Sequence, residues 1–394
     1  MKTWFPLAAI AFFLTPFGMP NVTVADESSS SPLVYEGEEG IGKGKHIVFI
    51  ANDHEYRSEQ SCPTLAKILA KHHGFRCTVL FGINEQGEIQ AGDAPVPGME
   101  ALKDADLLFF FTRFMKLPDE QVDLLVDYFE RGGPVVGART STHCFNGQQG
   151  KWAKLNFNYE GDDYLGGLGE QIFGNTWHSK RGQSHYGGNH SSSSRITALS
   201  SAKDHPILSG VGTMHAYSGA YKSQPPTGST PLVEVQVLNT FEPSDDVNED
   251  KPKVSAGWTT DHYVAPSGEK KDARVAYFSF GAGEDLLDED TRRCFANACL
   301  WALGMEDQIQ ADLDMGLVGS FVPTPFTTGA LYRDGVKPSE LSGWESEIMP
   351  TDHPLGGMEK QKMVRKVRTA LKARPELKEH VAETYPDLYG DLAD

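Results

Sequence analysis

Apolar runs and amphipathic helical segments alternate along the first third of the chain, and this alternation constrains the fold more than any other feature. The run 46–52 is apolar between its polar ends, which is typical of a strand buried on both faces. In the segment that follows, Leu65, Ile68 and Leu69 share one helical face. Such strand–helix–strand alternation predicts an α/β fold with a doubly wound, mostly parallel sheet. The other predicted strands of this part are 75–81, 105–114 and 134–139, and its predicted helices are 61–74 and 117–133.

Local signals set the ends of these helices. Ser61 is the predicted N-cap of the first helix, Pro63 lies in its first turn, and Gly74 ends it. Pro118 starts the second helix. Further along, apolar runs at 234–238, 253–263 and 273–286 predict strands, and 288–304 predicts a closing helix.

Charge and cysteine content narrow the classes of partner. Lysine and arginine total 36 against 54 aspartates and glutamates, a formal net charge of -18. Such a surface repels nucleic acid and anionic lipid, so we expect no nucleic-acid partner. The five cysteines form no Cys-x-x-Cys pair, so a cysteine zinc site is not indicated. We expect most of the thiols to be small buried hydrophobes.

Residues 1–25 show the pattern of a cleaved signal peptide. Lys2 precedes an apolar run from Trp4 to Met19, and the small-residue end lies at Ala25. The run is short for a membrane span and contains two prolines. We therefore expect a periplasmic or secreted protein with no integral membrane span after processing. An uncleaved anchor is the alternative.

Four further segments follow. Composition predicts an acidic, serine-rich linker over 26–44, an α/β domain over 45–304 and an arm rich in proline and glycine over 305–357. The charged segment 358–394 predicts a helical tail, either packed on the surface or bound to a protein partner of unknown kind. We expect the chain after 304 to be dispensable for folding.

The predicted sheet also locates the site. In an open parallel sheet, ligands bind outside the carboxyl ends of the strands. Three loops of this kind, 52–60, 112–116 and 140–147, are polar and charged. We therefore expect a small-molecule ligand to bind there.

The first of these loops carries a candidate acid–base group. His54 and Glu55 are predicted to be catalytic, because a histidine beside carboxylates can be a general base at neutral pH. Asp53 is predicted to contact the substrate. The alternative is a solvated turn, in which Asp53 bonds its own backbone and Arg57 pairs with Glu55.

The sharp turn that follows the predicted strand 134–139 supplies a second set of candidate site residues. Arg139 ends an apolar strand and must reach solvent or a carboxylate, and its fork of donors suits carboxylates or sugar hydroxyls. Thr140 and Ser141 are predicted substrate contacts, with capping of the next turn as an equal alternative. His143 is a further catalytic candidate. Because both loops leave parallel strands at the same edge, we expect the two groups to lie close together.

A third cluster lies in a segment rich in glycine and serine. Its histidines, His178, His185 and His190, have a spacing that fits no compact zinc pattern. We expect His178 to contact the substrate and assign no role to the other two. We expect no cofactor, and the alternative is a divalent metal held by His54, His143 and His178.

Four blocks of the sequence are IANDHEYRSEQSCPTLAKILAKHHGFRCTVLF, LPDEQVDLLVDYFERGGPVVGARTSTHCF, DHPILSGV and FGAGEDLLDEDTRRCFANACLWALG. Together they resemble the ThuA-like family, most closely its exported members of the kind common in planctomycetes. The resemblance covers about 45–304, and part of the arm resembles an extension of such members. It implies a class I glutamine amidotransferase-like fold, a flavodoxin-like three-layer α/β/α arrangement, and an association with the use of trehalose and related sugars.

Enzymes of that fold that hydrolyse glutamine need a cysteine on the turn, with a histidine and a glutamate near the last strand. Here the turn is GARTSTH, and Cys144 comes several residues after the strand breaks. Near the last strand, FGAGED offers Glu284 and Asp285 but no histidine. We therefore expect no glutamine amidotransferase activity.

Two functions from different classes remain. We favour a carbohydrate enzyme of hydrolase or isomerase type, acting on trehalose, another disaccharide or a keto-sugar by acid–base chemistry at the carboxyl edge of the sheet. The alternative is a non-catalytic sugar-binding or assembly module on the same fold. The polar crowding of three loops favours the enzyme, because a plain binding face needs fewer titratable groups.

Overall fold

The computed structural model describes residues 32–178, 182–186, 192–240, 242–321, 323, 326, 333–348, 371, 375 and 378–384. The predicted signal peptide and His190 lie outside these residues, as does most of the predicted tail, whose described part includes the helix α6 at Lys378–Thr384. Within the described ranges, no helix has both the length and the apolar character needed to cross a membrane.

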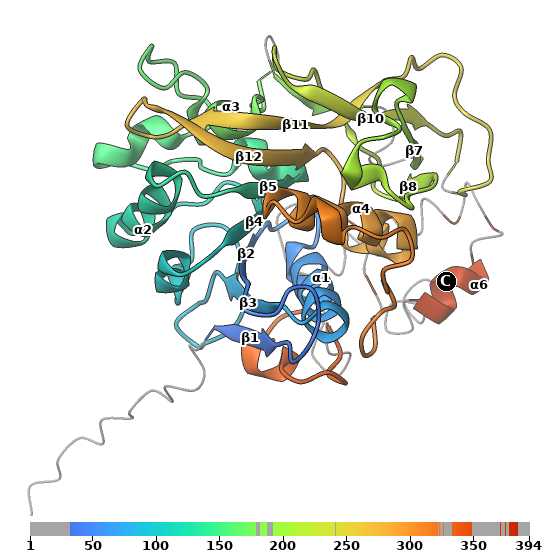
Figure 1. Cartoon of the computed structure of the whole chain (residues 1–394), viewed down its shortest axis with the longest axis horizontal. Helices are drawn as coiled ribbons and strands as arrows, with labels where there is room; N and C mark the ends of the chain where they lie inside the picture. Colours follow the sequence, from blue (N-terminus) through green and yellow to red (C-terminus); the bar gives the residue numbers. More distant parts are fainter. Residues whose placement is uncertain are drawn as a thin grey trace, which may run out of the picture.

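A sheet of ten strands runs through the molecule, in the order β1-β3-β2-β4-β5-β12-β11-β10-β7-β8 (Figure 1). Its middle strands β3, β2, β4, β5 and β12 are parallel neighbours. The strands are β1 Leu33–Glu36, β2 His46–Asn52, β3 Arg76–Phe81, β4 Leu107–Thr112, β5 Val135–Ala138, β7 Ser194–Ala198, β8 Met214–Ala216, β10 Thr230–Val237, β11 Val254–Val264 and β12 Lys270–Phe278, and a separate pair is β6 Ser184–His185 with β9 Tyr221–Lys222.

The expectation of a mostly parallel sheet is only partly correct. Strand β11 pairs antiparallel with β12 and with β10, and the sheet continues antiparallel through β7 to β8. The physical reason is the connection: β11 and β12 are joined by a short turn at 265–269, which can link only antiparallel strands, whereas parallel strands need a crossover. The sheet is therefore parallel from β3 to β12, where helices alternate with strands, and antiparallel at β1 and beyond β12.

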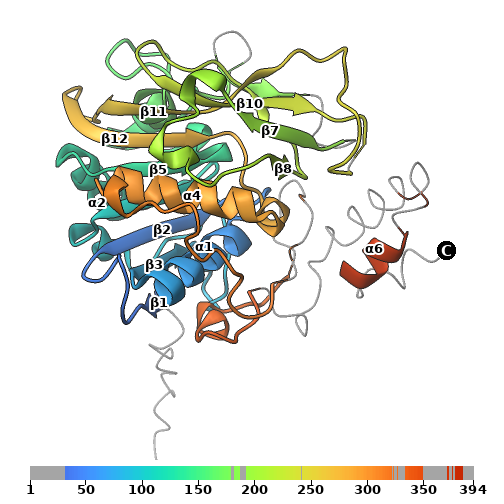
Figure 2. The same cartoon turned by 45° about the vertical axis from the view of Figure 1, so that its right-hand side comes forward.

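Helices cover both faces of the parallel part, which makes three layers (Figure 2). Along β2, Ile47, Phe49 and Ala51 belong to one hydrophobic core, and Val48 and Ile50 belong to another. Successive residues of a strand point to opposite faces, so the sheet separates the two cores. Helices α1 Ser58–His73 and α4 Glu289–Ala302 supply the first core, and α2 Asp119–Glu130 and α3 Gly167–Phe173 supply the second.

Helix α1 begins earlier than the sequence indicates. Its first residue is Ser58, so the predicted cap Ser61 and Pro63 both lie inside the helix. The turn before it is ordered by Asp53, whose Oδ1 accepts a hydrogen bond from the Glu55 N–H at 2.7 Å. This is the Asx turn foreseen in the solvated-turn alternative, although here Asp53 is fully buried. The compact turn allows the helix to start three residues sooner.

The segments on both sides of the predicted domain are part of its packing. The predicted linker contains β1, which pairs antiparallel with β3. The predicted arm places Met315, Val336 and Leu341 in the core shared with α1, and the Tyr35 hydroxyl donates to the Leu341 carbonyl at 2.7 Å. The described part of the arm is therefore packed against the domain: its apolar residues are spaced too irregularly to show a pattern in sequence, yet they are buried. That folding can proceed without the arm stays a prediction.

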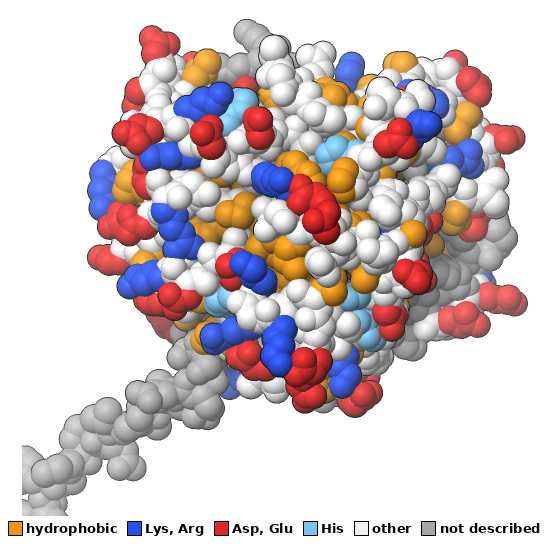
Figure 3. Space-filling view, viewed as in Figure 1, with side chains coloured by type: hydrophobic (Ala, Val, Ile, Leu, Met, Phe, Trp, Pro, Cys, Tyr) orange, Lys and Arg blue, Asp and Glu red, His pale blue; other side chains and the backbone are white. Residues whose placement is uncertain are grey.

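All five cysteines are buried and free, which confirms the expectation that most of them are small buried hydrophobes. Basic and acidic side chains are interspersed on the face seen in Figure 3. The described part of this face thus has no broad basic surface of the kind that tracks a nucleic-acid backbone.

Candidate functional site

Three residues hold a strained backbone, and each follows the carboxyl end of a parallel strand. Arg57 has φ 68° after β2, Phe114 has φ 51° after β4, and Arg139 has φ 48° after β5. In the described ranges these are the non-glycine residues with positive φ. Such conformations cost about 1–3 kcal/mol each and cluster at functional sites. The strained residues therefore lie at the edge of the sheet where the sequence predicts a ligand.

Arg139 forms the tip of the sharp turn between β5 and a 3-10 helix, η3, at Arg139–His143. Its side chain is fully buried and donates to the carbonyls of Gly219 at 2.7 Å and Ser218 at 2.9 Å. Its guanidinium lies 3.6 Å from the ring centroid of Tyr56 and 5.0 Å from that of Tyr221. The expectation that Arg139 reaches solvent is wrong, because backbone carbonyls and aromatic rings surround its guanidinium. The expectation of a carboxylate holds in another form: the charge of the buried Asp285, and not that of Asp53 or Glu55, acts on Arg139.

The two hydroxyls after Arg139 are also fully buried and bonded within the protein. Thr140 Oγ1 donates to Asp53 Oδ2 at 2.7 Å, which joins the loop after β5 to the loop after β2. Ser141 Oγ donates to the carbonyls of Phe110 and Ala138. The two loops thus meet as expected, but Asp53, Thr140 and Ser141 hold them together and do not face an open surface.

Arg113, from the loop after β4, links the predicted catalytic pair. Its Nη1 donates to His54 Nε2 at 2.6 Å, and its Nε lies 2.7 Å from Glu55 Oε2 in an ion pair. The guanidinium also lies over the Phe114 ring, 4.1 Å from the centroid. His54 is therefore oriented by Arg113, which the sequence analysis did not single out. The available signal was a charged residue directly after an apolar strand, as at Arg139.

This contact assigns the proton on His54. A guanidinium can only donate, so Nε2 of His54 must accept and the ring proton must sit on Nδ1. That Nδ1 is buried and has no hydrogen-bond partner. Burial lowers the pKa of His54 below its ordinary value; Asp53 and Asp93 oppose this shift, and Arg113 reinforces it. His54 is therefore a neutral imidazole at neutral pH, and its Nδ1–H is a buried donor without a hydrogen-bond partner.

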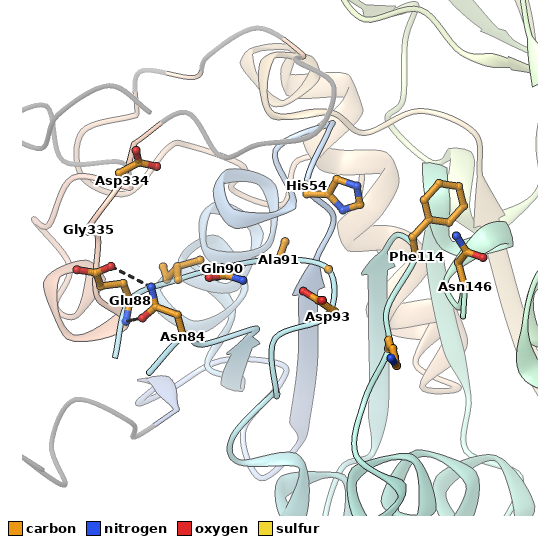
Figure 4. A pocket seen from close by; sticks show the side chains of 13 residues that line it. His54, Asn84, Glu88, Gln90, Ala91, Asp93, Phe114, Asn146, Asp334 and Gly335 are labelled. Atoms are coloured by element: carbon orange, nitrogen blue, oxygen red, sulfur yellow. Dashed lines mark hydrogen bonds between the residues drawn. The ribbon is translucent and has the colours of Figure 1, made fainter. Parts of the chain in front are cut away.

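His54 lines a pocket of about 830 Å³ at this edge of the sheet (Figure 4). The volume is within the range of small-molecule sites. The lining comes from the loops after β2, β3, β4 and β5 and from the arm. It consists of His54, Asn84, Glu88, Ile89, Gln90, Ala91, Gly92, Asp93, Phe114, Lys116, Asn146, Asp334 and Gly335.

His143 lies behind the pocket. Its ring is 5.4 Å from that of Phe114, and the ring of His54 is 6.3 Å from Phe114 on the pocket side. Trp177 and Tyr221 also pack against His143, whose side chain is buried. Burial, followed by the charge of Arg113, holds its pKa well below the ordinary value. His143 therefore belongs to the aromatic packing that supports Phe114 and does not line the pocket.

His178 does not line this pocket either. Its Nε2 lies 4.0 Å from Glu160 Oε1. Among the residues that the structure describes, no three histidine, cysteine, aspartate or glutamate side chains are grouped to hold a metal ion. The alternative of a metal held by His54, His143 and His178 is therefore not supported by their placement.

Glu59 is an unusual buried carboxyl close to this edge. It lies in the first turn of α1 with 1% of its surface exposed, and both carboxyl oxygens lack a hydrogen bond. Its nearest cation is Arg57, with Nη1 3.8 Å from Oε1. Burial raises the pKa of Glu59 to about 7, although Arg57 acts in the opposite direction. The burial of Glu59 has no local signal in the sequence, because acids are common in the exposed first turn of a helix.

Comparison with known proteins finds likeness in structure alone. No family profile matches the chain, and no curated protein is similar to it. It is similar to a putative ThuA-like protein from Bacteroides uniformis ATCC 8492, with 12% identity and a TM-score of 0.41 over 71% of this chain and 100% of the other. It is also similar to a putative ThuA-like protein from Parabacteroides merdae ATCC 43184, with 13% identity and a TM-score of 0.38 over 66% of this chain and 90% of the other.

A third solved structure is an exo-beta-1,4-mannosidase from Opitutaceae bacterium strain TAV5, with 9% identity and a TM-score of 0.30 over 65% of this chain and 35% of the other. The first two proteins carry the name of the family that the sequence blocks of this chain resemble.

Proposed function

We propose that this chain is an exported ThuA-like enzyme of carbohydrate utilisation, of hydrolase or isomerase type. The observation that carries the proposal is the neutral His54, held by Arg113 with an unused N–H, beside a polar pocket of about 830 Å³ at the carboxyl edge of the sheet. Export rests on the signal-peptide pattern of residues 1–25.

The chemistry follows from the protonation state of His54. A neutral imidazole N–H can polarise a substrate oxygen without carrying a full charge. Asp93 lines the same pocket and supplies a carboxylate that can accept a proton. In this arrangement His54 is a donor, and a carboxylate takes the role of base. A keto-sugar or a disaccharide, whose oxygens need such polarisation, is the substrate class that fits.

The residues around His54 have positioning roles. Arg113 fixes the ring and its tautomer, and Glu55 neutralises Arg113 through their ion pair. Arg139 and Thr140 hold the loops that carry these residues. Cys144 is buried, and burial raises the pKa of its thiol to about 12, so it supplies no thiolate for glutamine hydrolysis.

The alternative is a sugar-binding module without catalysis. The buried turn at Arg139 favours a binding module. The turn that would carry the nucleophile in an amidotransferase-like enzyme holds Arg139 instead, whose side chain is hydrogen-bonded to backbone carbonyls of the protein. Both functions use the same pocket and differ in turnover.

The test uses the mature chain from residue 26 and three variants: His54→Ala, Arg113→Gln and, as a control, His262→Ala on the distant strand β11. Calorimetry and product analysis with trehalose, other disaccharides and their keto derivatives measure binding and turnover. We expect His54→Ala to lower turnover about a hundredfold, with binding changed much less. The control should behave like the parent.

Arg113→Gln should shift the pH profile as well as lower the rate. Arg113 lowers the pKa of His54, so its removal should move the acidic limb of the profile to higher pH. Binding without turnover across the panel would favour the module. Full turnover in a folded His54→Ala variant would remove His54 from the mechanism.

A further inference from the structure

The arm after residue 304 forms one side of the pocket. Asp334 and Gly335 line it, although they lie more than 240 residues after the loop that faces them. In Figure 4 Asp334 lies at one end of the pocket, Asn146 lies at the other, and His54 lies between them. The pocket is therefore incomplete without the arm.

Two hydrogen bonds hold the neighbouring pocket loop in place. The Ile89 N–H donates to the Val336 carbonyl at 2.8 Å, which fixes the arm to the loop after β3. On the other side of this loop, the Gly92 N–H donates to Asn52 Oδ1 at 2.5 Å, and Asn52 is fully buried at the end of β2. Val336 is itself buried in the core. Asp334 is thus carried by an anchored segment.

The pocket lining carries more acidic than basic side chains. Three carboxylates, from Glu88, Asp93 and Asp334, face one ammonium group, from Lys116, while His54 is neutral. Glu88 also accepts a hydrogen bond from Asn84 Nδ2 at 2.9 Å, which orients its carboxylate (Figure 4). Carboxylates accept hydrogen bonds from sugar hydroxyls and from ammonium groups, and they repel other anions.

We propose that Asp334 of the arm is a specificity-determining residue that makes the pocket select neutral or amino sugars over anionic ones such as uronic acids and sugar phosphates. The inference rests on the proposed function, since it concerns the same pocket. Removing one of three like charges weakens the repulsion of an anion and leaves the binding of a neutral sugar less affected. Because Asp334 is exposed, its substitution should not unfold the protein.

The experiment uses the full mature chain, the variant Asp334→Asn and the control Asp312→Asn, an exposed aspartate of the arm that does not line the pocket. Calorimetry measures the affinity for trehalose, a glucosamine disaccharide, a glucuronic acid disaccharide and trehalose 6-phosphate, at low and high salt. Melting temperatures confirm that the variants fold.

We expect the parent to bind the neutral and amino sugars at least tenfold more tightly than the two anionic ones. Asp334→Asn should reduce this preference about tenfold, Asp312→Asn should not, and high salt should weaken the effect. If the sugars bind and His54→Ala abolishes turnover but Asp334→Asn leaves the preference unchanged, this inference is wrong and the proposed function stands. If no sugar of the panel binds, both are wrong.

Discussion

Replacing Glu59 with glutamine should stabilise the protein at high pH and leave its stability unchanged at low pH. The carboxyl is buried, both its oxygens lack hydrogen bonds, and Arg57 is 3.8 Å away. Burial disfavours the charged form of this carboxyl because it removes water, and Arg57 and the backbone N–H of Glu59 offset that cost only in part. Glutamine has nearly the same shape and resembles the protonated glutamic acid at every pH.

The pKa gives the size of the effect. Burial raises the pKa of Glu59 from 4.5 to about 7, and each pH unit corresponds to 1.36 kcal/mol, so ionisation in the folded state costs about 3 kcal/mol. Since the folded pKa lies above the unfolded one, the contribution to stability is fully present below pH 4.5 and is lost as the pH rises through 7. The glutamine variant does not suffer this loss.

Urea unfolding of the parent and of Glu59→Gln from pH 4.5 to pH 8.5 measures the difference. We expect the two free energies of unfolding to agree near pH 4.5 and to diverge to about 3 kcal/mol above pH 7. Glu249→Gln, at an exposed carboxyl, is the control and should track the parent. A difference that does not depend on pH would refute the reasoning, since it would show that Glu59 has the same pKa in both states.

Three further predictions follow from the packing. Arg139→Lys should lower the free energy of unfolding by about 3 kcal/mol, since one ammonium group cannot serve both carbonyls; a denaturation midpoint equal to that of the parent would contradict this. In the native state the buried thiols, Cys144 included, should resist alkylation, and Cys144→Ser should retain activity; protection of Cys144 by substrate would count against this view. Ending the chain at Gly304 should lower the melting temperature by about 10 °C or more, because Met315, Val336 and Leu341 leave the core, and an unchanged melting temperature would show that the arm packs only weakly.

The sequence by itself determined the parallel half of the fold. The run His46–Asn52 is a buried strand as predicted, and the helices that follow it and β4 lie where their apolar stripes indicate. Hydrophobic periodicity decides such elements, because each must bury one face or both. The same logic predicted which loops share the carboxyl edge, and the bond from Thr140 to Asp53 joins two of them.

Only the tertiary structure decided which polar residues of those loops face a ligand. Arg139 and His54 are both titratable residues just after strands. Arg139 is buried against backbone carbonyls and tyrosine rings, whereas His54 lines the pocket. Their partners, Gly219 and Arg113, come from distant parts of the chain, so no local pattern records them. The arm shows the same limit: Asp334 joins the pocket because Val336 is buried and bonded to Ile89 and because Leu341 is buried and bonded to Tyr35 of β1. Burial by distant residues leaves no signal in the neighbouring sequence.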